Sequence, residues 1–293
     1  MTDIFADKNI YPHEGKIKDH YKDFYETVFV AFLPFFKVDR QPTDNTNFKK
    51  SKQITHEEAR QELDILKDIP PFNADIFSYS NKDFPTDQEI FDSGQSICWG
   101  AVVKGSGLKN NSELNKALRT SIGALRQVFR RPELTEKLNN YTSNQSIWHP
   151  TEGGFDTLSK VAIYKAFKLL DKNEIIVTDE FYETNSTLEL DKLTAFDFVE
   201  KIGYKDYFIY SLDKKLLFTI EWDSFFFLIA TGQESMDKII TSKLFEGFLC
   251  NENTEHTWDY GEGEIQKYID LEEKQKVLTA NPKTKNQWWK FWN

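Results

Sequence analysis

Cysteine is scarce in this sequence, and long apolar runs are absent. Only Cys98 and Cys250 occur among its 293 residues, and neither lies in a CxxC or a zinc-ligand spacing. Because free cysteines are usually buried, we expect two reduced core thiols rather than a disulfide. The longest apolar run, residues 28–36, is about half the length that a membrane span requires. Since the first residues are polar and of mixed charge, unlike a secretory signal, we expect a cytoplasmic protein without a transmembrane segment.

Recognisable catalytic signatures are also missing. The five histidines share no metal-binding spacing, and no Ser or Cys is paired with a His in a known local signature. Residues 175–180, IIVTDE, resemble a Walker B strand, but the phosphate-binding pattern GxxxxGK[ST] does not occur. The sequence therefore indicates no cofactor and no metal ligand set, and it favours a protein that is not an enzyme.

The composition is that of a folded, acidic protein. Hydrophobic residues make up 39% and aromatic residues 15% of the chain, which excludes general disorder. The net charge of −10 is unevenly distributed, because residues 1–150 carry 20 Lys/Arg and 21 Asp/Glu, whereas residues 151–293 carry 17 and 26. The acidic second part argues against a general nucleic-acid coat and favours a basic protein as partner.

A change of pattern near residue 150 divides the chain. Residues 142–154, TSNQSIWHPTEGG, are polar, contain Pro and two Gly, and lie where the charge balance changes. Residues 1–150 are expected to be mainly helical. Residues 151–293 are expected to form an acidic region with a mixed sheet, flanking helices and an aromatic C-terminal tail. This order predicts an α/β or α+β fold, built either as two regions or as one continuous domain.

Local patterns predict most elements of both regions. Thr55 and Glu58 form a capping box that opens a helix continuing to about residue 66. The Pro-, Asp- and Phe-rich residues 72–94 are expected to be irregular, and Pro132 begins one or two helical turns. In the second region, apolar spacing predicts helices over 155–171, 193–202 and 236–244 and strands over 175–178, 207–210, 216–222, 224–230 and 247–250.

A basic stripe is the most distinctive local pattern. Residues 112–131 are predicted to form one amphipathic helix with an apolar face. On its other side, the cations fall within about 80° of one another at 100° per residue, and they are Lys116, Arg119, Arg126 and Arg130. Four aligned cations could bind phosphates of a nucleic acid or a nucleotide. The alternative is a solvated face, or one that docks on the acidic second region.

Carboxylates at predicted strand ends are the weak candidates for catalysis. Asp179 and Glu180 follow one strand, while Glu221 and Asp223 flank Trp222 at the end of another. Paired carboxylates can hold Mg²⁺ or act as acid and base, provided that they converge. Acidic residues that cap a turn or face water are the more common explanation of such a pattern.

The C-terminal residues 286–293, NQWWKFWN, combine four aromatic side chains with Lys290. Tryptophan beside lysine is typical of a membrane interface. It equally suits a terminal segment whose rings pack into a groove of its own domain, and we favour packing.

Four strings of the chain resemble an uncharacterised bacterial family, known only as a domain of unknown function. They are ALRTSIGALRQVF, SIWHPTEGGFD, IIVTDEFYE and FTIEWDSFFFLI, which spread over about residues 114–259. The resemblance implies a bacterial cytoplasmic protein. It supplies no activity, cofactor or catalytic residue to transfer.

Three functions are compatible with these patterns. We favour a non-catalytic intracellular binding or interaction protein, because the second region is acidic, aromatic residues are abundant and a catalytic set is missing. The second hypothesis is a nucleic-acid or phosphate-ligand binder that uses residues 112–131. The third is a metal-dependent hydrolase or transferase at the strand-end carboxylates.

Overall fold

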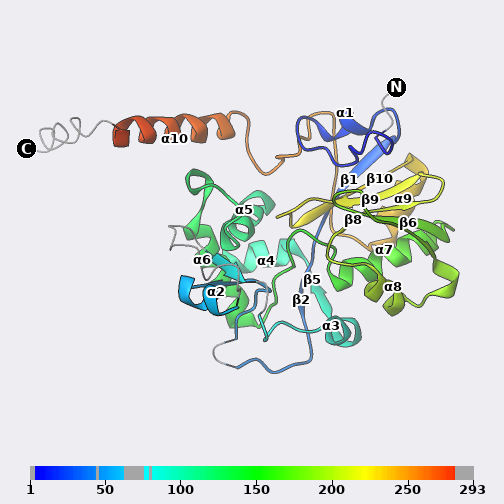
Figure 1. The fold of residues 1–293 in the computed structure, drawn as a ribbon, viewed down its shortest axis with the longest axis horizontal. Coiled ribbons are helices and arrows are strands. Elements are labelled where there is room, and N and C mark those ends of the chain that lie inside the picture. Colours follow the sequence, from blue (N-terminus) through cyan, green and yellow to red (C-terminus); the bar gives the residue numbers. More distant parts are fainter. Residues whose placement is uncertain (1–3, 44–45, 63–75, 79–80, 281–293) are drawn as a thin grey trace, which may run out of the picture.

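The centre of the fold is a seven-stranded antiparallel sheet (Figure 1). A computed structural model describes residues 4–43, 46–62, 76–78 and 81–280. The strands lie in the order β11-β1-β10-β9-β8-β6-β7, and each neighbouring pair is antiparallel. Their bounds are β1 Thr27–Phe32, β6 Glu174–Asp179, β7 Asn185–Glu189, β8 Asp206–Ser211, β9 Leu216–Ile220, β10 Phe226–Thr231 and β11 Gly247–Leu249. Because helices accompany a sheet that is antiparallel and not parallel, the fold is α+β, one of the two predicted classes.

Both faces of the sheet are covered, which explains why its central strands are apolar at nearly every position. Helix α7 (Thr157–Leu169) covers one face, where the ring of Phe167 lies 5.1 Å from that of Phe218 in β9. The N-terminal segment covers the other face, where the ring of Phe5 lies 4.8 Å from that of Tyr210 in β8. The large number of aromatic residues is therefore used mainly to fill two layers of packing around one sheet.

Most predicted elements of the second region are present. The three predicted helices are α7, α8 (Ala195–Lys201) and α9 (Gln233–Ser242), and the five predicted strands are β6, β8, β9, β10 and β11. Strand β7 was not predicted, and its exposed, polar sequence NSTLE explains why apolar spacing misses it. A charged helix, α10 (Glu264–Ala280), follows and lies away from the sheet (Figure 1).

The predicted continuous helix over residues 112–131 is wrong. Helix α5 (Asn111–Ser121) ends where Ile122 leaves helical geometry and Gly123 takes a left-handed conformation, with φ +74°. A short 3-10 turn, η2 (Gln127–Phe129), and helix α6 (Pro132–Gln145) follow. The apolar periodicity continues past the break because Leu125 and Phe129 are still buried, although they are not helical with α5.

The prediction that residues 72–94 are irregular is also wrong in part. Helix α3 (Asp87–Ser93) begins with a complete capping box between Thr86 and Glu89. Strand β4 (Ile76–Ser78) pairs with β3 (Lys52–Ile54), and β5 (Gln95–Ile97) pairs with β2 (Phe35–Lys37). The remaining helices are α1 (Ile17–Tyr21), α2 (His56–Glu62) and α4 (Trp99–Ser106).

The capping box predicted at Thr55 and Glu58 is confirmed, because the Glu58 N–H donates to the Thr55 hydroxyl at 3.2 Å and the Thr55 N–H donates to the Glu58 carboxylate at 2.7 Å. The continuation of that helix to residue 66 and the aromatic segment 286–293 lie outside the described residues. None of the described helices combines the length and the apolar composition that a membrane span requires.

The two regions of the chain are connected through the sheet. Strand β1 comes from the first region, yet it lies between β10 and β11. One hydrophobic core also includes Trp99 and Leu114 of the first region together with Phe227 of the second. The proposed division near residue 150 into two separate domains remains a prediction.

Candidate functional site

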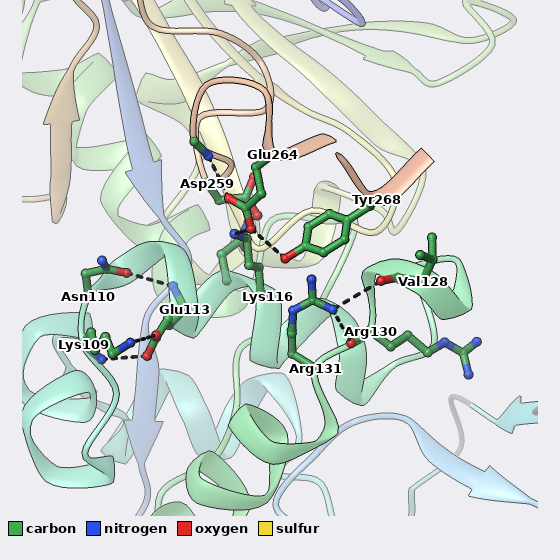
Figure 2. Close-up of polar contacts among 12 residues, drawn as sticks. Lys109, Asn110, Glu113, Lys116, Val128, Arg130, Arg131, Asp259, Glu264 and Tyr268 are labelled. Carbon is green, nitrogen blue, oxygen red and sulfur yellow. Dashed lines mark hydrogen bonds and ion pairs between the residues drawn. The ribbon is translucent and has the colours of Figure 1, made fainter. Parts of the chain in front are cut away.

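Lys116, the first cation of the predicted stripe, is directed toward helix α10 (Figure 2). Its Nζ donates to the Glu264 carboxylate at 2.7 Å and lies 4.4 Å from the centroid of the Tyr260 ring. The Lys116 side chain keeps only 10% of its surface exposed. Because an opposite charge and an aromatic face already surround this ammonium, Lys116 acts within the protein as an anchor for α10.

Lys116 and Arg119 both lie on α5, whereas Arg126 and Arg130 follow its end at Ser121 and flank η2. Arg126 pairs with Glu272 of α10, with 2.9 Å between nitrogen and oxygen. Arg130 donates from Nε to the carbonyl of Leu125 at 2.8 Å. Two of the four predicted anion-binding residues therefore make ion pairs with the acidic C-terminal helix, and the four do not form one helical face.

Arg119 interacts electrostatically with carboxylates of two different loops. Burial raises the pKa of Asp223 and of Asp259 above the usual value, and the charge of Arg119 offsets part of this rise. Asp259 also accepts a hydrogen bond of 2.9 Å from the side-chain amide of Asn115 in α5. Arg119 is half-buried, so this cation compensates internal negative charge more than it offers a phosphate site.

The predicted carboxylates lie at one end of the sheet. β6 and β9 flank β8 and run antiparallel to it, so both end on the same side. Asp179 is committed to its own turn, where its carboxylate accepts from the backbone N–H groups of Phe181 at 2.9 Å, Glu183 at 3.0 Å and Thr184 at 2.6 Å. Burial tends to raise the pKa of Asp179, but these hydrogen bonds and that of the Thr184 hydroxyl hold it below the usual value.

The remaining three carboxylates differ in their partners. Glu221 pairs with His13, with 3.0 Å between the Oε1 and Nδ1 atoms. Asp223 has a left-handed backbone, with φ +57°. Burial raises the pKa of the Tyr204 phenol, and the negative charges of Glu152, Asp223 and Glu180 raise it further, in this order. One carboxylate from each predicted pair therefore approaches the same tyrosine, while no group of three possible ligands within the described residues could hold a metal ion.

Comparison with known proteins assigns the chain to a family. The family model described as "Protein of unknown function (DUF2711)" matches residues 13–260. The chain belongs to the DUF2711 family. A relative from Bacillus subtilis (strain 168), "Uncharacterized protein YwbB", is 24% identical over 177 residues, which are 60% of this chain and 77% of that protein. No solved structure matches the chain. The resemblance to a bacterial family of unknown function is confirmed.

Exposed aromatic side chains accompany the carboxylates in this DUF2711 member. Phe181 is 58% exposed, Trp222 49% and Tyr204 48%, and no other described aromatic side chain is as exposed. Phe181 follows β6, Trp222 follows β9, and Tyr204 precedes β8. Because β8 lies between β6 and β9 and runs antiparallel to both, all three side chains lie at the same end of these strands. Together with Glu180 and Asp223 they define the surface called here the sheet-end patch.

The sequence prediction included the acidic members of the sheet-end patch but not the aromatic ones. The available signal was the position of Phe181 and Trp222 directly beside acidic residues, in DEF and EWD. Tyr204 carried no such signal, because it follows Gly203 at the end of a predicted helix and only the sheet order brings it between the other two.

Proposed function

We propose that this chain is a non-catalytic binding protein whose sheet-end patch receives a Lys- or Arg-bearing segment of a basic partner protein. The observation that carries the proposal is the position of the three exposed aromatic side chains. They gather among carboxylates at one end of the sheet, although packing accounts for nearly all other aromatic residues of the described chain. Exposed aromatic clusters of this kind are typical of interaction sites.

The chemistry of the sheet-end patch suits cations. A Lys or Arg over an exposed aromatic ring contributes about 0.5–1 kcal/mol, and more when the contact is desolvated. Phe181, Tyr204 and Trp222 lie just beyond the ends of adjacent strands, which are spaced by roughly 4.8 Å, so a single extended segment can reach more than one ring. Carboxylates beside the rings add attraction and speed the encounter with a positively charged partner.

Two nearby cations limit this attraction. Arg119 compensates part of the charge of Asp223, and the exposed Lys205 directly follows Tyr204. The excess of acidic residues in 151–293, 26 against 17 basic ones, still favours a basic partner over an acidic one. The proposal includes the cytoplasmic location predicted from the sequence.

Binding of a short basic peptide tests the proposal. Fluorescently labelled hexa-arginine and hexa-lysine are titrated with the full chain, and the fluorescence anisotropy gives Kd at low and at high salt, with hexa-glutamate as the oppositely charged probe. Trp222→Ala and Glu180→Lys are expected to weaken binding about five- to tenfold each, the loss of one cation–π contact or one close charge. Lys205→Ala is expected to strengthen it.

Two control variants distinguish binding at the sheet-end patch from a general effect of surface charge or of an exposed apolar side chain. Leu212→Ala removes an equally exposed apolar side chain, 48% exposed, beyond the opposite end of β8. Glu136→Lys reverses an exposed charge on α6. Equal weakening by Glu136→Lys and Glu180→Lys, or unchanged binding in Trp222→Ala, refutes the proposed surface.

The two other functions are less well supported. For a nucleic-acid or phosphate ligand, Lys116 and Arg126 would have to leave Glu264 and Glu272. For a metal-dependent hydrolase or transferase, Asp179 would have to leave the turn that it caps. We therefore favour a binding role at the sheet-end patch over both of these functions.

A further inference from the structure

A cavity of about 440 Å³ lies beside the sheet-end patch and shares Tyr204 with it. Its walls come from β2, the residue Lys50 before β3, residues 81–90 up to and including the start of α3, the segment that leads into α7 with the first turn of that helix, and the end of α8. The volume falls in the lower part of the range of about 300–1,000 Å³ that small-molecule sites occupy. None of the residues predicted from the sequence as site residues lines this cavity.

The segment that leads into α7 has unusual burial. Residues 147–155 contain no helix and no paired strand beyond the single bridge of Trp148 to Phe36, yet all nine are buried. Irregular segments usually run over the surface, because their backbone polar groups need partners. Here the buried segment brings Thr151, Gly154 and Phe155 to the cavity wall. Because residues 147–155 are buried, this wall of the cavity has a defined shape.

Charges of both signs meet in the cavity. The Lys160 ammonium donates to the carbonyls of Val199 at 3.2 Å and Ile202 at 2.6 Å, which leaves one N–H. Burial lowers the pKa of Lys160, Asp87 raises it and the ammonium of Lys50 lowers it. These three side chains all line the cavity, so each is close enough to affect the others.

Two of the three acidic residues that line the cavity are held at helix starts, and the third, Glu200, lies near the end of α8. Asp156 caps α7 by accepting from the N–H of Ser159 at 2.8 Å. Asp87, in the first turn of α3, accepts from the hydroxyl of Thr157 with one oxygen, and the second oxygen of this exposed carboxylate can accept from a ligand. The ammonium of Lys50 lies 5.9 Å from the Phe84 ring.

Apolar side chains form another part of the lining. Phe36, Phe84, Ile90 and Phe155 form the apolar walls. A ligand with only one sign of charge would leave the opposite side of the cavity desolvated without a partner, which is unfavourable. An amino acid presents a carboxylate, an ammonium and an apolar side chain within one small molecule.

We infer that the cavity is a binding site for a small zwitterion of amino-acid type. Lys50 receives its carboxylate, Asp87 its ammonium, and the aromatic walls its side chain. This site is distinct from the sheet-end patch, because a small ligand occupies the interior of the cavity whereas a partner segment lies across the exposed rings.

Thermal-shift measurements on the full chain with each standard amino acid at millimolar concentration identify the preferred probe. Isothermal titration then compares that amino acid with its decarboxylated amine and its deaminated acid. We expect the amino acid to bind about tenfold or more tightly than either analogue, as the loss of one charge-assisted contact implies. The inference is overturned if no amino acid binds, or if the amine or the acid binds as tightly.

Two variants assign the charged contacts. Lys50→Met is expected to abolish the preference for the amino acid over the amine, and Asp87→Asn to abolish its preference over the acid. Lys82→Met, at an exposed lysine that does not line the cavity, and Asp92→Asn, on the same helix as Asp87, are the controls. Preferences that survive in the cavity variants, or vanish in the controls, contradict the assignment.

Discussion

Asp156 offers a test of the electrostatics of the buried segment through the pH dependence of stability. Burial is the main reason why the pKa of this carboxyl rises from 3.8 to about 6, against hydrogen bonds from Ser159 and the charge of Lys160. The folded protein therefore binds a proton between these two pH values that the unfolded chain does not bind. By linkage, the contribution of Asp156 to stability decreases as the pH rises from 3.8 to about 6 and is constant outside this window.

The size of the effect follows from the same two values. At roughly 1.4 kcal/mol per pKa unit, the difference between 3.8 and about 6 corresponds to at most about 3 kcal/mol. The Asp156 side chain is only half-buried, so part of it remains in contact with water. We therefore expect solvent screening to reduce the contribution of this titration to about 1–2 kcal/mol. Asp156→Asn keeps an oxygen that can cap α7 and removes the titration, so its stability relative to the wild type should increase by this amount between about pH 4 and about pH 7.

Urea unfolding, followed by tryptophan fluorescence across that pH range, measures the difference. His149 also titrates: burial and then Lys49 lower its pKa to about 3, so its contribution is lost as the pH falls from 6.5 toward 3. This loss occurs in both proteins and cancels when they are compared. Asp83→Asn, at an exposed aspartate, is the control. A difference between wild type and Asp156→Asn that does not change with pH would refute the assignment.

Three further predictions concern other parts of the fold. Gly247→Ala places a Cβ 1.8 Å from a carbonyl oxygen of β1, and overpacking of this kind should reduce the free energy of unfolding by about 1–3 kcal/mol in urea titrations. A double-mutant cycle of Lys116→Met and Glu264→Gln should give a coupling of about 1 kcal/mol and faster hydrogen exchange in α10, whereas unchanged exchange would mean that the pair does not anchor the helix. The expectation of two core thiols is wrong for Cys98, which is exposed, and only Cys250 is buried. Cys98 should therefore react rapidly with a thiol reagent, whereas Cys250, whose pKa desolvation raises to about 12, should react only after unfolding; equal rates would contradict this difference.

The elements of the second region could be predicted because their signals are local. Helix α7 shows apolar spacing, and α8 begins with a capping box between Thr194 and Asp197. Strands β9 and β10 are continuous apolar runs, as expected for strands covered on both faces. The position of β1 in the same sheet could not be predicted, because its pairing with β10 joins Thr27 to Thr231 across most of the chain.

The failures have equally specific causes. The basic helix was extended too far because buried apolar residues recur after Gly123 with nearly helical spacing, while the left-handed glycine ends α5. Helix α3 was missed although its capping box, formed by Thr86 and Glu89, is readable in the sequence. The surrounding Pro, Asp and Phe residues favoured an irregular segment, and the prediction followed this composition instead of the capping box.

The candidate sites show the same division between local and long-range information. Glu180 and Asp223 could be recognised as strand-end carboxylates, but their approach to Tyr204 depends on the order β9-β8-β6. The cavity is further from local prediction, because it requires Lys50 from the first region and Lys160 from the second to share one space. The local pattern of a single sequence does not show that residues so far apart in the chain line the same cavity.

The charge asymmetry of the chain has a structural explanation in part. Lys116 and Arg126 of the first region pair with Glu264 and Glu272 of the acidic second region, so part of the opposite charge is used to attach α10. At the sheet-end patch, the nearby cations among the described residues are Arg119, which compensates part of the charge of Asp223, and the exposed Lys205. Under the proposed function, we therefore expect an external cation to contribute most to binding at this end of the sheet, where exposed rings and carboxylates lie together.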